Sequence, residues 1–178
     1  MKNLKKLFNP KGLIGSILVV LVVLIAIFAP LIIPPEYATR MDMRARLSPP
    51  DFSHWLGTDQ LGRDLFYRMM LGARTSINIA ASAVLISLII GLPLGLVSGY
   101  FGGRVDNVLM RLVDTLLSFP ALLLALTISA VLGPSMQNTI IAIGIAFTPY
   151  LARLIRGEAL RVSQMPYVEA AISSGATH

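Results

Sequence analysis

Three long stretches without Asp, Glu, Lys or Arg constrain the fold of this 178-residue sequence more than any other feature. They cover residues 12–35, 75–103 and 115–152. A helix needs about 20 apolar residues to cross the roughly 30 Å of hydrocarbon in a bilayer. The first two stretches therefore predict one membrane-spanning helix each. The third is long enough for two, because the turn-forming segment 132–138 interrupts it.

These stretches predict an all-α, polytopic membrane protein. The expected helices cover residues 13–33, 77–99, 115–132 and 139–157. Charged residues make up only 13% of the sequence, against about 25% in ordinary soluble domains, which excludes a soluble enzyme domain and a disordered chain. The net charge is +6, and the basic residues lie largely at the ends of the apolar stretches. This placement indicates that they orient the chain in a membrane rather than bind nucleic acid.

The basic residues predict which side of the membrane each segment occupies. Lys2, Lys5, Lys6 and Lys11 favour a cytoplasmic N-terminus, which places residues 34–74 outside and the C-terminal end inside. Six arginines within 34–74 count against this orientation. The first apolar stretch is also compatible with a signal peptide, but it exceeds the usual length of about 7–15 residues and no A-x-A cleavage site follows it. An uncleaved anchor is therefore favoured.

No motif in the sequence indicates an enzyme. The P-loop, H-E-x-x-H and G-x-S-x-G patterns do not occur, and no predicted span carries paired carboxylates. The sequence contains no cysteine and only two histidines, which disfavours a metal centre. We therefore expect neither a catalytic residue nor a bound cofactor or metal in this chain.

The C-terminal segment predicts a short cytoplasmic helix. Pro166 suits the first turn of a helix, and Glu169 places a negative charge near the positive end of the helix dipole. Ala170 and Ala171 are small, and Gly175 is suited to ending the helix. These features are compatible with a docking element and equally with a surface helix that has no partner.

Residues 57–64 predict a second structured segment. Gly57 and Gly62 favour turns, Asp59 can accept hydrogen bonds from nearby backbone N–H groups, and Arg63 can pair with a carboxylate. A purely structural role accounts for this pattern without any ligand.

Both segments resemble motifs of ABC importer permeases. Glu169, Ala170, Ala171 and Gly175 match the first half of the EAA loop, E-A-A-x-x-x-G-x9-I-x-L-P, which in that family is the coupling helix that docks on the ATPase. The earlier segment resembles the G-T-D-x-L-G-R-D motif of the permease with an N-terminal anchor, often called the C-type permease, in the dipeptide, oligopeptide and nickel subfamily. The matching residues are Gly57, Thr58, Asp59, Leu61, Gly62, Arg63 and Asp64.

The resemblance continues along the chain, through residues 9–15, 28–32, 99–106 and 119–120. It implies an anchor helix with an extracytoplasmic segment over 1–74 and a transmembrane permease domain over 75–178. Family members have six spans and a complete EAA loop. The I-x-L-P half and two spans do not occur in these 178 residues, so we expect either a fragment or a truncated product.

The resemblance also implies a function. The chain would be a multi-pass protein of the prokaryotic cell membrane that helps to form the path for peptides, nickel or similar solutes by ATP-driven alternating access. Its partners would be a second homologous permease, two ABC ATPase subunits that use the ATP, an extracytoplasmic solute-binding protein and the lipid bilayer.

Other interpretations remain open. The chain could be a non-transporting four-helix anchor or assembly protein, or a non-functional truncated permease. A secondary transporter is disfavoured because no inverted repeat or ionisable group near a bilayer midplane is visible. Within the permease interpretation, Gly91, Pro93 and Gly95 are candidate bending points of the second span, or ordinary membrane-helix residues. Tyr100, Phe119 and Tyr150 are candidates for the solute path, or for interfacial positions.

Overall fold

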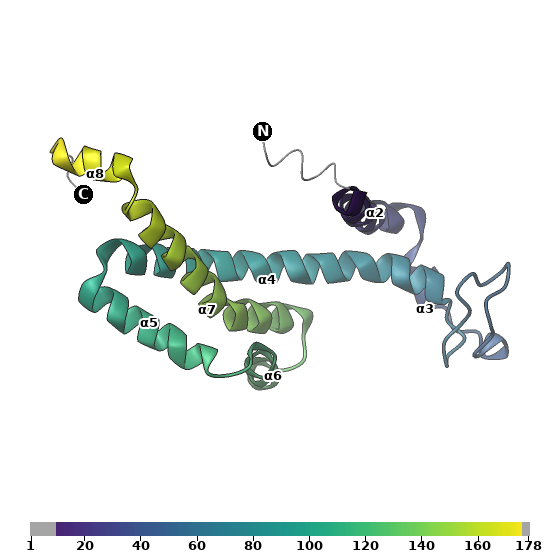
Figure 1. The fold of residues 1–178 in the computed structure, drawn as a ribbon. Helices are drawn as coiled ribbons and strands as arrows, with labels where there is room; N and C mark the ends of the chain where they lie inside the picture. Colours follow the sequence, from purple (N-terminus) through teal and green to yellow (C-terminus); the bar gives the residue numbers. More distant parts are fainter. Residues whose placement is uncertain (1–9, 176–178) are drawn as a thin grey trace. The chain divides into compact units, whose positions relative to one another are not determined.

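The computed structural model describes residues 10–175 of the chain, and within them every regular element is a helix (Figure 1). The predicted all-α fold class is therefore confirmed. Contacts divide the chain into two compact units, residues 1–78 and 79–178, which are described separately. Lys2, Lys5, Lys6 and Asn9 lie outside the described residues.

The first unit begins with an apolar helix, α2 (Pro10–Ile32). It ends two residues before Pro34, because Pro34 and Pro35 cannot donate the backbone hydrogen bonds that would continue a helix. Two short elements follow, α3 (Pro35–Thr39) and the 3₁₀ helix η1 (Met43–Ala45). A turn-rich loop then leads to the start of α4.

Helix α4 (Leu65–Phe101) is much longer than the predicted helix 77–99. Its 37 residues measure about 55 Å at 1.5 Å per residue, well beyond the thickness of a hydrocarbon core. The prediction was wrong about its start because the helix was placed within the charge-free stretch 75–103, whereas α4 begins ten residues before that stretch and includes Arg68 and Arg74. Charge limits the part of a helix that enters the membrane, whereas backbone hydrogen bonding continues outside it.

The predicted helix 115–132 is also wrong in its boundaries. Residues 103–117 form a separate helix, α5 (Gly103–Leu117), and α6 (Ala121–Leu132) follows it. The two helices are bent by 86° relative to each other across the intervening residues 118–120. Pro120 accounts for the break, because its ring is incompatible with a continuous helix at this point.

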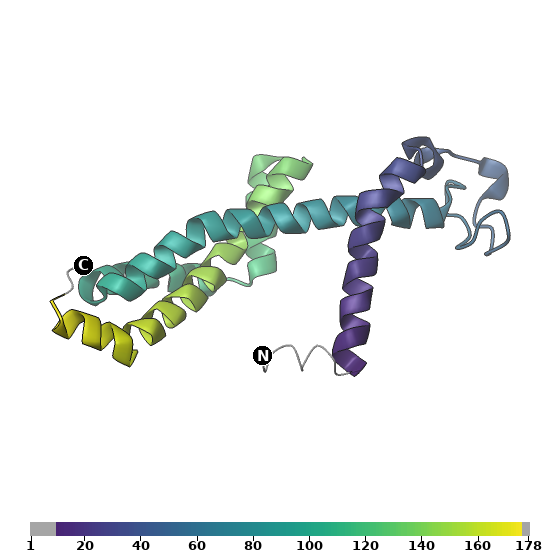
Figure 2. The ribbon, with the colours of Figure 1, turned by 90° about the horizontal axis from the view of Figure 1, so that it is seen from above.

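Helix α7 (Met136–Ser163) extends the predicted helix 139–157 at both ends. It packs against α5, α6 and α8 and is the central helix of the second unit (Figures 1 and 2). Its contacts use small residues: Ala142, Ala146 and Ala152 are essentially inaccessible to solvent, as is Pro149. The last helix, α8 (Pro166–Ser173), matches the predicted short C-terminal helix and carries Pro166 in its first turn.

Three helices are long and apolar enough to cross a membrane: Lys11–Ile32, Leu65–Phe101 and Met136–Ser163. The 12 residues of α6 are too few to cross alone, since they cover about 18 Å. The described residues therefore hold three spans, or four if the bent pair of α5 and α6 forms one broken span. A polytopic membrane protein is confirmed in either case.

Candidate functional site

The seven residues of the G-T-D-x-L-G-R-D motif lie together in one compact loop just before α4. The backbones of Thr58 and Asp64 pair as an isolated antiparallel bridge, which closes the loop at its base. Gly57, Thr58, Gly62 and Asp64 are buried, Asp59 and Arg63 are half-buried, and Leu61 is exposed. The motif therefore forms the interior of the loop rather than a free surface.

Asp59 is the main acceptor inside this loop. Its carboxylate accepts hydrogen bonds from the backbone N–H groups of Leu61 (2.8 Å) and Arg63 (3.0 Å). It also accepts from the side chains of Arg63 (2.8 Å) and Arg68 (2.9 Å). Its partial desolvation would raise its pKa, but the hydrogen bonds and charge of Arg63, with the backbone bond from Leu61, lower the pKa to about 2. Both sequence predictions, a backbone-capping Asp59 and a paired Arg63, are confirmed.

Asp64 links the loop to the first turn of α4. Its carboxylate accepts from the backbone N–H groups of Phe66 (2.8 Å) and Tyr67 (3.3 Å), which fall among the unpaired donors at a helix N-terminus. The other oxygen lies 2.9 Å from Nδ1 of His54. Sequence reasoning missed this partner because His54 lies ten positions away and no local pattern connects the two.

The backbone conformation at the two glycine positions of the motif, and the space around them, do not suit a residue with a side chain. Gly57 and Gly62 have φ angles of +71° and +70°. A β-carbon on Gly62 would lie 1.7 Å from the carbonyl oxygen of Asp42, and one on Gly57 would lie 2.5 Å from that of Ser48. The predicted turns are confirmed, and both glycines also permit close contact with the preceding segment.

The residues of the predicted coupling loop lie on or directly after α8. Glu169 is in the first turn of the helix, and Gly175 follows its end with a φ of +88°. Glu169, Ala170, Ala171 and Gly175 are all exposed. This helix buries none of its residues, so the structure leaves the whole predicted contact surface open.

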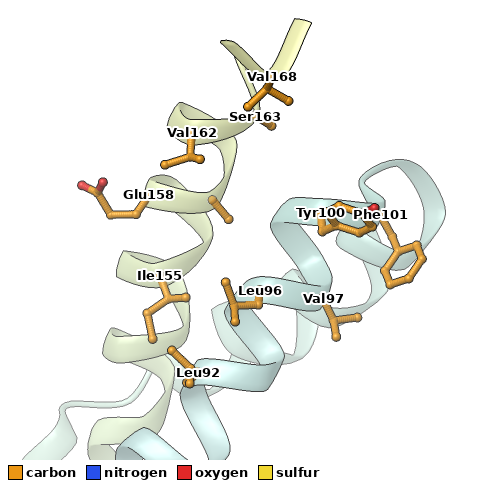
Figure 3. Close-up of a pocket in the computed structure, with 11 residues that line it drawn as sticks. Leu92, Leu96, Val97, Tyr100, Phe101, Ile155, Glu158, Val162, Ser163 and Val168 are labelled. Atoms are coloured by element: carbon orange, nitrogen blue, oxygen red, sulfur yellow. The ribbon is translucent and has the colours of Figure 1, made fainter. Parts of the chain in front are cut away.

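A groove of about 760 Å³ lies where the end of α4 runs beside the end of α7 (Figure 3). Leu96 and Tyr100 line it from α4, Ile155 and Val162 from α7, and Val168 extends it to α8. The lining is almost entirely apolar, and the carboxylate of Glu158 points away from α4. Tyr150 lines a different groove, so the structure does not bring the candidate path residues Tyr100 and Tyr150 into one cavity.

Glycines let α4 and α7 come into backbone contact. A β-carbon built on Gly91, Gly95 or Gly99 would lie within 3.1 Å of an α7 atom. In the opposite direction, one on Gly144 would lie 2.7 Å from the Ile86 side chain. Sequence reasoning interpreted Gly91 and Gly95 as bending points or ordinary glycines. Their regular spacing of four residues is the signal that would have indicated a close helix pair.

An ion pair joins α5 to α7. Arg156 donates from Nε and Nη2 to the two carboxylate oxygens of Asp106, at 2.5 and 2.6 Å. The hydroxyl of Ser98, on α4, donates to the same carboxylate. Sequence reasoning missed this cluster, because its three members are spread over 59 positions of the chain.

Two known protein families match most of this sequence between them. The family described as the binding-protein-dependent transport system inner membrane component matches residues 91–178. The N-terminal TM domain of oligopeptide transport permease C matches residues 7–50.

Individual relatives match nearly the whole chain. The dipeptide transport system permease protein DppC of Alkalihalophilus pseudofirmus is 42% identical over 98% of this chain and 56% of its own length. The glutathione transport system permease protein GsiD of Pectobacterium atrosepticum is 39% identical over 91% of this chain and 54% of its own length. The oligopeptide transport system permease protein OppC of Bacillus subtilis is 40% identical over 94% and 55%. The chain thus spans just over half the length of these curated relatives.

Proposed function

The chain belongs to the family of inner membrane components of binding-protein-dependent transport systems, and from this premise we propose that it is a permease subunit of an ABC importer for peptides. The family consists of membrane transport components rather than enzymes. The proposal assigns ATP hydrolysis to two partner ATPase subunits and solute capture to an extracytoplasmic binding protein. A second, homologous permease completes the path.

The observation that carries this proposal is the exposed helix α8. It follows α7 after only Gln164 and Met165, and it presents Glu169, Ala170 and Ala171 to solvent. Small side chains allow a partner surface to approach a helix closely, and Ile172, which is 64% exposed, supplies apolar area for burial. We therefore assign α8 and Gly175 as the contact with the ATPase.

In the proposed mechanism, closure of the ATPases on ATP displaces α8 and, through the short connection, α7. The membrane helices then shift between inward-facing and outward-facing arrangements, and groups of packed helices move largely as rigid bodies. The peptide class is supported by the relatives, whose names specify dipeptide, glutathione and oligopeptide transport. The proposed orientation has the N-terminus and α8 in the cytoplasm and the 34–74 segment outside.

The proposal is tested by coexpressing the tagged chain with its partner subunits and measuring two quantities: recovery of the ATPase subunits, and ATP-driven uptake of a radiolabelled dipeptide into proteoliposomes. Gly175→Asp introduces bulk and charge on the assigned contact surface, and we expect it to abolish ATPase recovery and uptake together. Gly133→Asp is the matched control, because Gly133 also has a positive φ (+86°) and open surroundings but lies beyond the end of α6.

The alternative, a non-transporting membrane anchor, predicts that no ATPase is recovered with the wild-type chain. Recovery of the ATPase with both wild type and Gly175→Asp, with equal uptake, would instead overturn the assignment of α8 while leaving the permease function in place.

A further inference from the structure

We propose that Asp106 and Arg156 are positioning residues for transport, because their ion pair keeps α7 attached to α4 and α5 when the movement of α8 displaces α7. This inference rests on the proposed function. It assigns to the two residues no contact with the peptide: they act by keeping three helices together as one body.

The carboxylate of Asp106 accepts hydrogen bonds from two other helices, which fixes its position. Both of its oxygens are bonded to Arg156, in the two-pronged arrangement that the planar guanidinium favours. Ser98 bonds to one of them and is itself fully buried. The side chains of Asp106 and Arg156 are only 15% and 31% exposed. Residues from α4, α5 and α7 therefore meet at a single, largely enclosed carboxylate.

A tight turn between α4 and α5 brings Asp106 to this position. Gly102 and Gly103 have φ angles of +60° and +53°, which lets the chain reverse within two residues. The reversal returns Asp106, in the first turn of α5, to Ser98 in the last turn of α4. The positive end of the α5 dipole also favours a carboxylate there.

Arg156 can contact Asp106 because Gly99 has no side chain to keep α7 away from α4. A β-carbon at Gly99 would lie 3.0 Å from the carbonyl oxygen of Arg156 and 2.6 Å from the β-carbon of Ala159. The backbone of α7 thus lies directly on the end of α4 at the level of the ion pair. Arg156 also lies in the C-terminal part of α7, so a displacement of α8 reaches it before the N-terminal part of α7.

A second ion pair joins the same two helices without these features. Arg153 bonds to Asp114, and their side chains are 54% and 58% exposed. Solvent weakens an exposed ion pair. When such a pair is broken, each remaining charge is still solvated by water. This pair is a matched control within the same chain, because it has the same residue types and the same pair of helices.

The test uses the assembled importer with Arg156→Lys and Asp106→Asn. Lysine retains the charge but cannot form the two-pronged contact. We expect both variants to recover the ATPase subunits. Peptide uptake per ATP hydrolysed should fall by roughly tenfold, a size typical of substitutions between two coupled sites. Arg153→Lys and Asp114→Asn should leave this ratio within about twofold of wild type.

A third variant separates positioning from simple folding. The exchanged pair Asp106→Arg with Arg156→Asp restores the attraction between α5 and α7, and it should recover uptake per ATP relative to either single change. Wild-type coupling in Arg156→Lys and Asp106→Asn would overturn the inference. Loss of assembly in both, with no recovery in the exchanged pair, would also overturn it, because the residues would then be needed only for folding. Absence of uptake by the wild-type complex would instead overturn the proposed function.

Discussion

The α-carbon of Gly95 lies against the backbone of Ala152, so that a β-carbon built on Gly95 would be 2.5 Å from the carbonyl oxygen of Ala152. Gly91 and Gly99, four residues before and after, make similarly close approaches to α7. Apolar surface alone does not hold helices together in lipid, because lipid tails are equally apolar. Close backbone packing at small residues therefore stabilises the contact between α4 and α7, together with the buried hydrogen bond from the Ser87 hydroxyl to the carbonyl oxygen of Gly144 (2.7 Å).

We predict that Gly95→Ala destabilises the protein by about 1–3 kcal/mol, because the added methyl group forces the two backbones apart. Thermal unfolding in detergent measures the change. Gly157→Ala is the control: Gly157 also lies in a helix, but nothing is within 4 Å of its β-carbon position. That control should be neutral or stabilise by up to about 1 kcal/mol. Equal unfolding temperatures for Gly95→Ala and Gly157→Ala would contradict the packing described here.

A second prediction concerns the loop before α4. Gly62→Ala combines an unfavourable positive φ with overlap on the Asp42 carbonyl group, whereas Gly133→Ala has the unfavourable φ and open space. The positive φ alone costs about 1–2 kcal/mol. Gly62→Ala should therefore unfold the loop locally, as measured by protease cleavage between residues 40 and 64. Resistance equal to that of Gly133→Ala would show that the loop has room for a side chain.

A third prediction follows from the lowered pKa of Asp59. A carboxyl group whose pKa falls from 3.8 to about 2 on folding stabilises the folded state when it is ionised. This contribution is complete above the ordinary pKa and is lost as the pH falls from about 4 to about 2. Thermal unfolding in detergent at several pH values should therefore decline more steeply for wild type than for Asp59→Asn over this window. Parallel pH profiles would show that Asp59 is not held by Arg63 and Arg68.

The fourth prediction tests orientation, and the cysteine-free sequence makes it simple. Phe52→Cys and Ile172→Cys each place one thiol at an exposed position. In intact cells, a membrane-impermeant maleimide should label Phe52→Cys but reach Ile172→Cys only after the membrane is opened. The reverse pattern would invert the proposed topology and place α8 on the side opposite the ATPases.

Local signals predicted some elements well and others poorly. Helix α8 was predicted because Pro166, Glu169 and Gly175 each act within one or two turns of their own position. Helix α5 was missed because the predicted helices were placed on charge-free stretches, whereas residues 104–114 include charged side chains. Its apolar positions do follow a helical repeat, since Val105, Val108, Leu109 and Leu112 fall at positions i, i+3, i+4 and i+7. That pattern would have identified an amphipathic helix.

The sequence by itself determined that this chain is helical and inserts into a membrane, since both follow from the length of its charge-free stretches. It also determined the turns at Gly57 and Gly62, because their causes lie within a few neighbouring residues. Only the tertiary structure decided that Gly95 meets Ala152 and that Asp106 pairs with Arg156. These contacts join positions that are 57 and 50 residues apart in the sequence. Nothing in the local sequence specifies such a partner: it depends on which helix faces pack together.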